Sequence, residues 1–299
     1  MIPLACPNCH TLLKDISLTV KQCPQDSLTF QLADGIWRML LPGREEMYNQ
    51  FIHDYETIRR AEGRGSENSS YYRSLPYHDS AEWRIRSASF DAFIKHILEP
   101  AEASSPLSIL DLGAGNSWLS NRLASRGHNV SAVDLTINDF DGLGCYSFFE
   151  TTFLSVRAEF TALPFSDRSV DLIVFNASLH YSTSYEETLI ESIRILNEAG
   201  LLVILDSPVY HDPASGVKMV REREAQFEDR YGFASNSLSS ENYLTYARLE
   251  ELGRKLNLQW NFYTPFYGFS RLLRPLAARL LGRREPARFH VIAGSRITS

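Results

Sequence analysis

The sequence predicts an α/β fold that is doubly wound around a mostly parallel sheet. From residue 107 onward, short apolar runs alternate with amphipathic segments, which is the pattern of repeated strand–helix–strand units. The first run ends in a glycine-rich turn that opens into a helix, where a ligand can approach bare backbone. The 299 residues are 44% hydrophobic and carry a net charge of −6. This balance supports a sizeable core and argues against a surface that grips nucleic acid throughout.

The expected elements follow in order along the chain. We expect parallel strands at residues 107–111, 129–134, 155–159, 170–175 and 201–206. We expect helices between and after them at 117–126, 185–196 and 216–231. Two later extended segments, 256–262 and 288–293, would add edge strands and complete a seven-stranded sheet.

Ahead of this domain, two further regions are predicted. Residues 1–41 form a small zinc-ribbon-like segment, whose last strand lies near residues 34–40. Residues 42–100 form a helical cap and lid, because 44–60 and 83–98 show helical apolar spacing, the second helix ending before Pro100. The Gly/Ser-rich stretch 61–70 between them is expected to be a mobile loop. The α/β domain with a basic C-terminal extension takes up residues 101–299.

Three of the four cysteines cluster near the start of the chain, at Cys6, Cys9 and Cys23. The longest aliphatic run, residues 201–205, is far shorter than the ~20 residues of a membrane span, and no secretory signal precedes it. We therefore expect a cytoplasmic, reducing location, which favours metal over disulfides. Asp26 stands where a fourth cysteine is usual. The alternatives are a zinc ion bound by these four residues and a ribbon that holds without metal.

The glycine-rich turn is the strongest functional signal. Residues 109–116 read ILDLGAGN, so a buried strand ends in Asp-x-Gly-x-Gly. A dinucleotide-binding turn would need a third glycine, but Trp118 stands there. Three more markers follow in order. Asp134 closes the second strand, where a carboxylate can accept ribose hydroxyls, and the stretches 159–167 (EFTALPFSD) and 169–180 (SVDLIVFNASLH) come next.

These four motifs, in this order, resemble the class I S-adenosylmethionine-dependent methyltransferases, and within them the ubiquinone/menaquinone-type group. The resemblance covers residues 107–207 and implies a Rossmann-like fold that binds S-adenosylmethionine. It implies that the glycine turn wraps the methionine moiety, that Asp134 holds the ribose and that Glu159, where relatives more often carry Asp, contacts the adenine. The implied cofactor-binding residues are Asp111, Gly113, Ala114, Gly115, Asn116, Asp134, Leu135, Glu159, Phe160, Asn176, Ala177 and Ser178.

Catalytic candidates come from the chemistry that this resemblance implies. Methyl transfer from a sulfonium is an in-line displacement, so positioning dominates, and an acceptor O–H or N–H also needs a base. His180, just beyond the fourth strand, is the candidate base or else a structural residue. Asp206 ends the fifth strand, where open α/β sheets bind ligands. Tyr71 and Tyr72 follow the expected mobile loop and form an aromatic lid over the cofactor, or simply pack a cap helix.

The two ends of the chain leave alternatives open. The ribbon resembles the zinc-binding segment of ribosomal RNA guanine-N1 methyltransferases and the small zinc-ribbon activator of tRNA and protein methyltransferases. The last 29 residues hold seven arginines and one glutamate, which suits a solvated surface helix, an anionic substrate, a membrane surface or an RNA backbone. We favour a methyltransferase for a small or lipid-like acceptor. The alternatives are a ribosomal or transfer RNA methyltransferase and a non-catalytic binding module.

Overall fold

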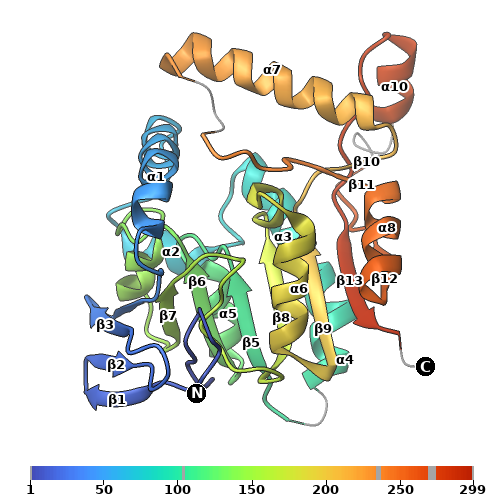
Figure 1. Ribbon diagram of the computed structural model, residues 1–299. Helices are drawn as coiled ribbons and strands as arrows, with labels where there is room; N and C mark the ends of the chain where they lie inside the picture. The colour runs from blue at the N-terminus through green and yellow to red at the C-terminus, as the bar shows by residue number, and fades with distance from the viewer. Residues whose placement is uncertain (1, 103–104, 234–236, 269–273, 298–299) are drawn as a thin grey trace.

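A single twisted sheet runs through the computed structural model, which describes residues 2–102, 105–233, 237–268 and 274–297 (Figure 1). Its centre is made of five parallel strands: β5 Ser108–Leu112, β6 Asn129–Asp134, β7 Leu154–Arg157, β8 Val170–Asn176 and β9 Leu196–Leu205. β13 (Val291–Arg296) pairs antiparallel with β9, and β12 (Leu258–Tyr263) pairs antiparallel with β13. These seven strands, in the order β7-β6-β5-β8-β9-β13-β12, are the expected sheet.

The strand order reverses between β5 and β8, which are neighbours in the sheet although β6 and β7 separate them in the chain. In open α/β sheets, the turns that leave two such strands diverge to opposite faces and open a crevice at their carboxyl ends. This topology places the glycine-rich turn after β5 and the segment after β8 on the two walls of one crevice.

The sheet is wider than predicted, because the structure describes eleven strands in it. The four additional strands come from the N-terminal segment: β1 Lys14–Ser17, β2 Val20–Gln22, β3 Thr29–Ala33 and β4 Ile36–Arg38. β4 lies parallel to β7 and pairs Trp37 with Val156. Its burial against the edge of β7 satisfies backbone groups that an edge strand would otherwise leave open. The ribbon-like segment is therefore continuous with the sheet, and the division of domains at residues 41 and 100 stays a prediction.

The cap helices differ from the prediction at two points. α1 (Arg44–Ala61) agrees with the expected helix, but Ser69 and Ser70 of the expected mobile loop begin α2 (Ser69–Ser74). The Asn68 side chain caps α2 by accepting a hydrogen bond from the Ser70 N–H at 2.9 Å. Another helix, α3 (Ala81–Phe93), continues through the π-helical turn η1 (Ile94–Leu98) into α4 (Glu99–Glu102), past Pro100. Proline lacks an N–H donor, so the chain continues past Pro100 without a backbone hydrogen bond from that residue.

The remaining helices cover both faces of the sheet or lie across its end, as Figure 1 shows. They are α5 Trp118–Ser125, α6 Tyr185–Ile195, α7 Pro213–Tyr231, α8 Tyr246–Leu256 and α10 Arg274–Leu280. α8 was not predicted. Because it ends at Leu256, the strand expected at 256–262 begins at Leu258 instead. A short parallel pair, β10 (Val209–Tyr210) with β11 (Leu244–Thr245), links the segments before α7 and α8.

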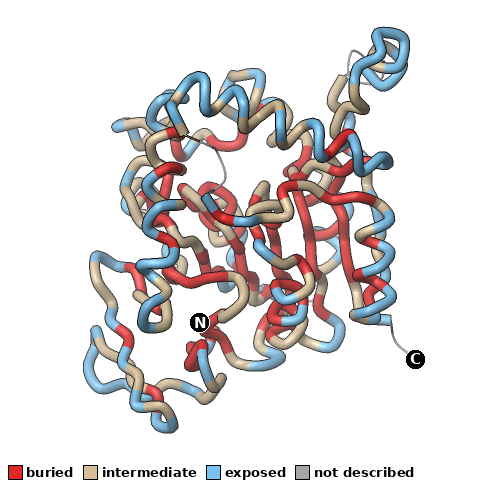
Figure 2. The backbone as a smooth tube through the Cα atoms, turned by 45° about the horizontal axis from the view of Figure 1, so that its top comes forward, coloured by how far each residue is buried: buried red, intermediate tan, exposed pale blue. Residues whose placement is uncertain are grey.

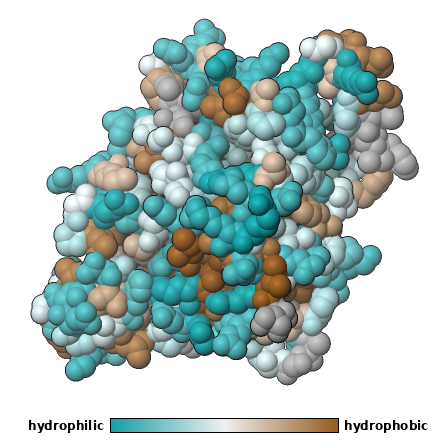
Figure 3. All heavy atoms as spheres, turned by 45° about the vertical axis from the view of Figure 1, so that its right-hand side comes forward, coloured by the Kyte–Doolittle hydropathy of each residue, from teal (hydrophilic) through white to brown (hydrophobic). Residues whose placement is uncertain are grey.

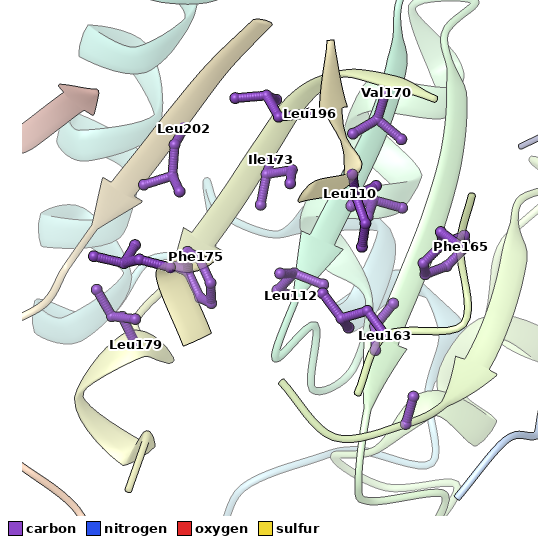
Figure 4. Packing of buried hydrophobic residues seen from close by; sticks show 14 of the residues in the cluster. Leu110, Leu112, Leu163, Phe165, Val170, Ile173, Phe175, Leu179, Leu196 and Leu202 are labelled. Carbon is purple, nitrogen blue, oxygen red and sulfur yellow. The ribbon is translucent and has the colours of Figure 1, made fainter. Parts of the chain in front are cut away.

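Two hydrophobic clusters sandwich the sheet, and its strands are the most buried part of the chain in Figure 2. One cluster joins β5, β8 and β9 to α6 and α8 through side chains such as Leu110, Ile173 and Leu202 (Figure 4). The other packs Phe90 of α3 and Trp118 of α5 on the opposite face. The doubly wound prediction is confirmed by this packing.

Exposed apolar side chains lie at many points along the chain, and one group of them belongs to α10. On the face in Figure 3, apolar atoms gather at the upper right, where α10 lies. Leu276 and Leu280 of α10 are 59% and 78% exposed. Of the helices that the structure describes, none has the length and apolar character needed to cross a membrane.

Candidate functional site

The turn after β5 closes tightly against the segment after β8. Gly113 has φ +75°, and a Cβ built on it would lie 2.3 Å from the Cβ of Ser178 and 3.2 Å from the ring of Phe160. The Ser178 hydroxyl donates a hydrogen bond to the Leu112 carbonyl, which holds the two walls together. Any side chain at 113 would push these walls apart, so the glycine is needed for the close approach as well as for the left-handed backbone.

Asp134 connects the end of β6 to this turn. One carboxylate oxygen accepts a hydrogen bond from the Gly115 N–H at 2.8 Å. The other accepts from the N–H and the hydroxyl of Thr136, both at 2.7 Å. Burial raises the pKa of the Asp134 carboxyl, while these hydrogen bonds lower it. The carboxylate is thereby fixed in direction and faces a cavity that it helps to line.

This first cavity has a volume of about 770 Å³, open mouth included, and has an aromatic wall. Tyr48, Phe51 and Tyr55 come from α1, and Phe160 follows β7. Phe160 meets the ring of Phe175 edge-on at 5.5 Å, which fixes its plane. A flat, apolar, aromatic wall beside a hydrogen-bonded carboxylate is suited to a nucleoside, which has a π face and a polar sugar.

Glu159 lies at the α1 side of the first cavity and is buried. Its carboxylate accepts a hydrogen bond from the Tyr48 hydroxyl at 2.7 Å and forms an ion pair with Arg44. Sequence reasoning expected an adenine contact and did not foresee either partner. The pair ties α1 over the end of β7, so α1 forms a lid on this cavity.

A second cavity of about 1400 Å³ continues from the first. The two share lining residues from both sides of the crevice: Tyr55, Gly113, Gly115, Ala177 and Tyr181. Asn176, at the end of β8, faces the second cavity and has a buried amide oxygen without a hydrogen-bond partner in the described part of the chain. Buried polar atoms are normally paired, so this oxygen is a candidate ligand acceptor.

An ion pair lines the second cavity beside the glycine turn. Arg59 of α1 contacts Asp141, and their side chains are 18% and 5% exposed. Asn116 donates its side-chain N–H to Asp141 at 3.4 Å. The pair presents one positive and one negative group at the same place. Sequence reasoning missed both residues, because neither lies in a motif and 82 positions separate them.

The predicted catalytic residues separate into two groups. His180 and Asp206 line the second cavity. The His180 Nδ1 lies 3.3 Å from the Ser207 hydroxyl, and Asp206 accepts a hydrogen bond from the Ser89 hydroxyl at 2.5 Å. Burial lowers the pKa of His180 to about 3, and the positive charges of Arg223 and Arg86 act in the same direction. His180 is therefore neutral at pH 7 and a weak base.

Tyr72 is placed away from both cavities, contrary to its prediction as a catalytic and cofactor-binding residue. It is fully buried, and its hydroxyl donates to the Phe140 carbonyl at 2.7 Å and accepts from the Ser66 N–H at 3.0 Å. Its ring stacks on Phe148 at 4.5 Å. The packing alternative holds for Tyr72. Tyr71 differs, since it lines the second cavity.

Asp111 also lies outside both linings, directly beneath the turn. It is fully buried and accepts a hydrogen bond from the Ser120 hydroxyl of α5 at 2.7 Å. Burial raises its pKa to about 7. Its position supports the strand-to-helix junction from below. The other predicted cofactor residues line one cavity or both: Gly113, Ala114, Gly115, Asn116, Asp134, Leu135, Glu159, Phe160, Asn176, Ala177 and Ser178.

The N-terminal cysteines converge with Asp26, as the sequence predicted. One ligand atom from each of Cys6, Cys9, Cys23 and Asp26 can be chosen so that all four lie within 4.8 Å of one another. The Cys9 and Cys23 sulfurs are 3.4 Å apart, and the Cys6 sulfur is 3.3 Å from an Asp26 oxygen. Donors of a tetrahedral zinc ion with bonds of about 2.3 Å are separated by about 3.8 Å. This set of donors fits a zinc ion with little movement.

Comparison with known protein families finds a match in the centre of the chain. Residues 110–204 match the family described as a methyltransferase domain. A malonyl-[acyl-carrier protein] O-methyltransferase from Coxiella burnetii is 34% identical over 104 residues, which cover 33% of each chain. A malonyl-[acyl-carrier protein] O-methyltransferase from Erwinia pyrifoliae is 29% identical over 112 residues, 36% of this chain and 39% of the relative. The match thus spans only about a third of the length of these relatives.

Solved structures share the fold at low sequence identity. The YcgJ protein of Bacillus subtilis superimposes with a TM-score of 0.51 and 17% identity, over 71% of this chain and 100% of the other. A 1,6-didemethyltoxoflavin-N1-methyltransferase of Burkholderia thailandensis, solved with its substrate and S-adenosylhomocysteine, superimposes with a TM-score of 0.50 and 15% identity, over 95% of this chain and 99% of the other. These likenesses concern the fold.

Proposed function

Because its central part, residues 110–204, is a class I S-adenosylmethionine-dependent methyltransferase domain, we propose that this chain transfers the methyl group of S-adenosylmethionine to a small or lipid-like acceptor. The observation that carries the proposal is the meeting of two cavities at the glycine turn. The first has the aromatic and carboxylate wall of a nucleoside site, and the second has room for another molecule. The methyl group would sit where they join.

The residues of the first cavity fit the nucleoside. A carboxylate accepts about four hydrogen bonds, so the Asp134 side chain keeps capacity for a ribose hydroxyl beside the three bonds described. Phe160 offers its ring face to the adenine, and the tight approach at Gly113 brings the ligand onto backbone. In the second cavity, Arg59 and Asp141 match the carboxylate and the ammonium of the methionine end.

The bound donor supplies a methyl group already activated by a positively charged sulfur. What the chain contributes is orientation and exclusion of water. Tyr55 and Tyr181 line both cavities and meet edge-on at 5.9 Å, so their rings flank the junction. Aromatic faces stabilise a nearby cation, and two reactants held in line react as if at very high concentration. A weakly basic His180 fits an acceptor that enters already ionised, or one that His180 binds by hydrogen bonding.

Two observations support a small or lipid-like acceptor: the names of the curated relatives and the residues that line the second cavity. The curated relatives are named malonyl-[acyl-carrier protein] O-methyltransferases, and a malonyl group is a small acyl unit on a carrier. Trp83, Tyr210 and Phe289 line the second cavity here and provide apolar surface for such a group. We propose an acceptor of this general size.

Calorimetric titration with S-adenosylhomocysteine tests the proposal, because this product binds without an identified acceptor. We expect Asp134→Ala to lower its affinity more than tenfold, about 1.4 kcal/mol. Asp139→Ala is the matched control, since Asp139 is exposed on the same loop and lines neither cavity. An unchanged affinity in Asp134→Ala contradicts the ribose assignment, and no binding to the wild type contradicts the function.

We also propose that Cys6, Cys9, Cys23 and Asp26 hold a structural zinc ion. The burial of Cys6 and Cys23 and the convergence of four donors support it. Elemental analysis of purified protein should find about one zinc per chain. Cys6→Ser should lose the metal and melt earlier, whereas Cys145→Ser, which changes a buried cysteine elsewhere, should keep it. Metal-free wild type with a Cys6→Ser variant of equal stability contradicts the zinc proposal.

A further inference from the structure

Arginines are concentrated on the wall of the second cavity. They come from α1, the loop after it, α3, α7 and the C-terminal segment, and the described ones are Arg59, Arg64, Arg86, Arg223, Arg274 and Arg284. The carboxylates found in the same lining are Asp141 and Asp206. A concave site lined by an excess of one charge raises the local concentration of ions of opposite sign.

Several of these arginines form ion pairs with carboxylates. Arg59 is paired with Asp141 beside the glycine turn. Arg284 is 2.7 Å from Glu222, which lies outside the lining. Arg64 is paired with Glu62 and with Glu82, and Glu82 also pairs with Arg86; both carboxylates lie outside the lining. Arg86 thus keeps Glu82 as a partner on its own helix, at 3.3 Å.

Arg86 and Arg223 line the second cavity from two different helices. Arg86 belongs to α3, lies over the Trp83 ring at 5.1 Å and is 21% exposed. Arg223 belongs to α7 and donates to the Asn242 side-chain oxygen, while the Asn242 N–H donates to the His180 carbonyl at 3.0 Å. Both guanidinium groups act electrostatically on His180. Arg223 is linked through Asn242 to the segment that follows β8, and both arginines line the second cavity.

We propose that the methyl acceptor carries an oxyanion, a carboxylate or a phosphate, which Arg86 and Arg223 bind between them. The guanidinium fork matches the paired oxygens of such groups, and two forks from separate helices fix their direction. This inference rests on the proposed function and names its substrate class. An acceptor held in this way enters ionised, so a carboxylate oxygen can itself attack the methyl group and no proton has to be removed. The bond from sulfur to methyl breaks as the bond from oxygen to methyl forms, and the electron pair stays on sulfur.

The test measures anion binding by the wild-type protein saturated with S-adenosylhomocysteine. The probes are malonate, inorganic phosphate and neutral malonamide. We expect malonate or phosphate to bind and malonamide not to bind. The double variant Arg86→Gln/Arg223→Gln should bind the anion at least tenfold more weakly. The control Arg84→Gln/Arg221→Gln removes two exposed arginines from the same two helices. Neither arginine lines the cavity, so this variant should bind the anion as the wild type does.

The outcomes distinguish the acceptor proposal from the function that it rests on. Preference for malonate identifies a carboxylate, and preference for phosphate identifies a phosphoryl group. Absence of anion binding in a wild type that binds S-adenosylhomocysteine overturns the acceptor proposal alone, as does equal weakening by the control variant. A wild type that does not bind S-adenosylhomocysteine overturns the proposed function instead. Arg86→Lys/Arg223→Lys, which keeps the charge, should recover part of the affinity lost in the glutamine variant; no recovery with intact folding contradicts an electrostatic role.

Discussion

The two sides of the crevice are built in different ways. The side proposed for the cofactor comes largely from turns at the ends of adjacent parallel strands, within residues 113–178, with α1 laid over them. The side proposed for the acceptor draws its residues from α3, α7 and the segment after α10, which are far apart in the chain. A cofactor that many enzymes share can be bound by turns that are local in the sequence. An acceptor that is particular to one enzyme needs a wall assembled from segments far apart in the chain.

The two sides also differ in chemistry. Aromatic rings and two hydrogen-bonded carboxylates, Asp134 and Glu159, characterise the cofactor side, while guanidinium groups are concentrated on the acceptor side. If this division is correct, substitutions on one side should change the binding of one ligand and leave the other ligand nearly unaffected.

Gly113→Ala should have the largest effect. The added Cβ would meet Ser178 at 2.3 Å in a left-handed backbone, so the turn and the β8 wall must separate. We expect affinity for S-adenosylhomocysteine to fall about 100-fold or more, equivalent to about 2.7 kcal/mol, in calorimetric titration.

Gly127→Ala is the control for the strain itself. Gly127 has φ +92°, with nothing within 4 Å of an added Cβ, and lies outside both linings. It should lose stability but bind the ligand normally. If the two variants bind equally well, the close approach at Gly113 has no part in binding.

The contrast between the two sides also explains what sequence reasoning could predict. The strands, the glycine turn and Asp134 were predictable because each depends on neighbours within a few residues and on a parallel sheet that brings strand ends together. Arg86 and Arg223 were not, because nothing local distinguishes them from Arg84 and Arg221 on the same helices. Their significance comes from where α3 and α7 pack.

His180 provides a prediction for the acceptor side. Its pKa is about 3 in the folded chain and 6.5 ordinarily, so between these values the unfolded chain binds a proton that the folded chain excludes. Stability from this group is present above pH 6.5 and is lost as pH falls toward 3. Between pH 7 and pH 5, the wild type should therefore lose about 2 kcal/mol more than His180→Gln in urea unfolding.

Two features isolate this effect from other titrations. The pKa of Asp111 is raised to about 7, so its contribution to the stability of the fold has the opposite pH dependence and is lost as pH rises from 3.8. This contribution is the same in the wild type and in His180→Gln, so it cancels in the comparison. His53→Gln changes an exposed histidine on α1 and should keep the wild-type loss. A His180→Gln variant with the same pH dependence as the wild type contradicts a buried, neutral His180.

Arg59→Gln should have a smaller and more selective effect. If Arg59 holds the methionine carboxylate, its loss weakens S-adenosylhomocysteine by about tenfold, or 1.4 kcal/mol. The affinity for 5′-methylthioadenosine, which lacks the amino acid, should remain within about twofold. Comparing both ligands in one variant cancels any loss of stability from leaving Asp141 buried without its partner. Equal weakening of both ligands contradicts the assignment.

The incorrect predictions have a shared physical cause. Tyr72 follows a polar stretch, and this suggested a lid, but α2 packs it against Phe148 in the core. The sheet was predicted to have seven strands, yet β4 of the N-terminal segment pairs with the open edge of β7 and extends it. In each case a long-range contact decides the outcome, and local pattern does not record such contacts. The aromatic lid on the cofactor side comes from α1, whose Tyr48, Phe51 and Tyr55 read only as helix-spaced apolar positions.

A crystal structure of the protein with S-adenosylhomocysteine is the most direct test of the central claim. The account predicts the ribose on Asp134, the adenine beside Phe160 and the sulfur at the junction between Gly113 and Tyr181. A nucleoside bound anywhere else, or a crevice filled by the side chains of the chain itself, would contradict it.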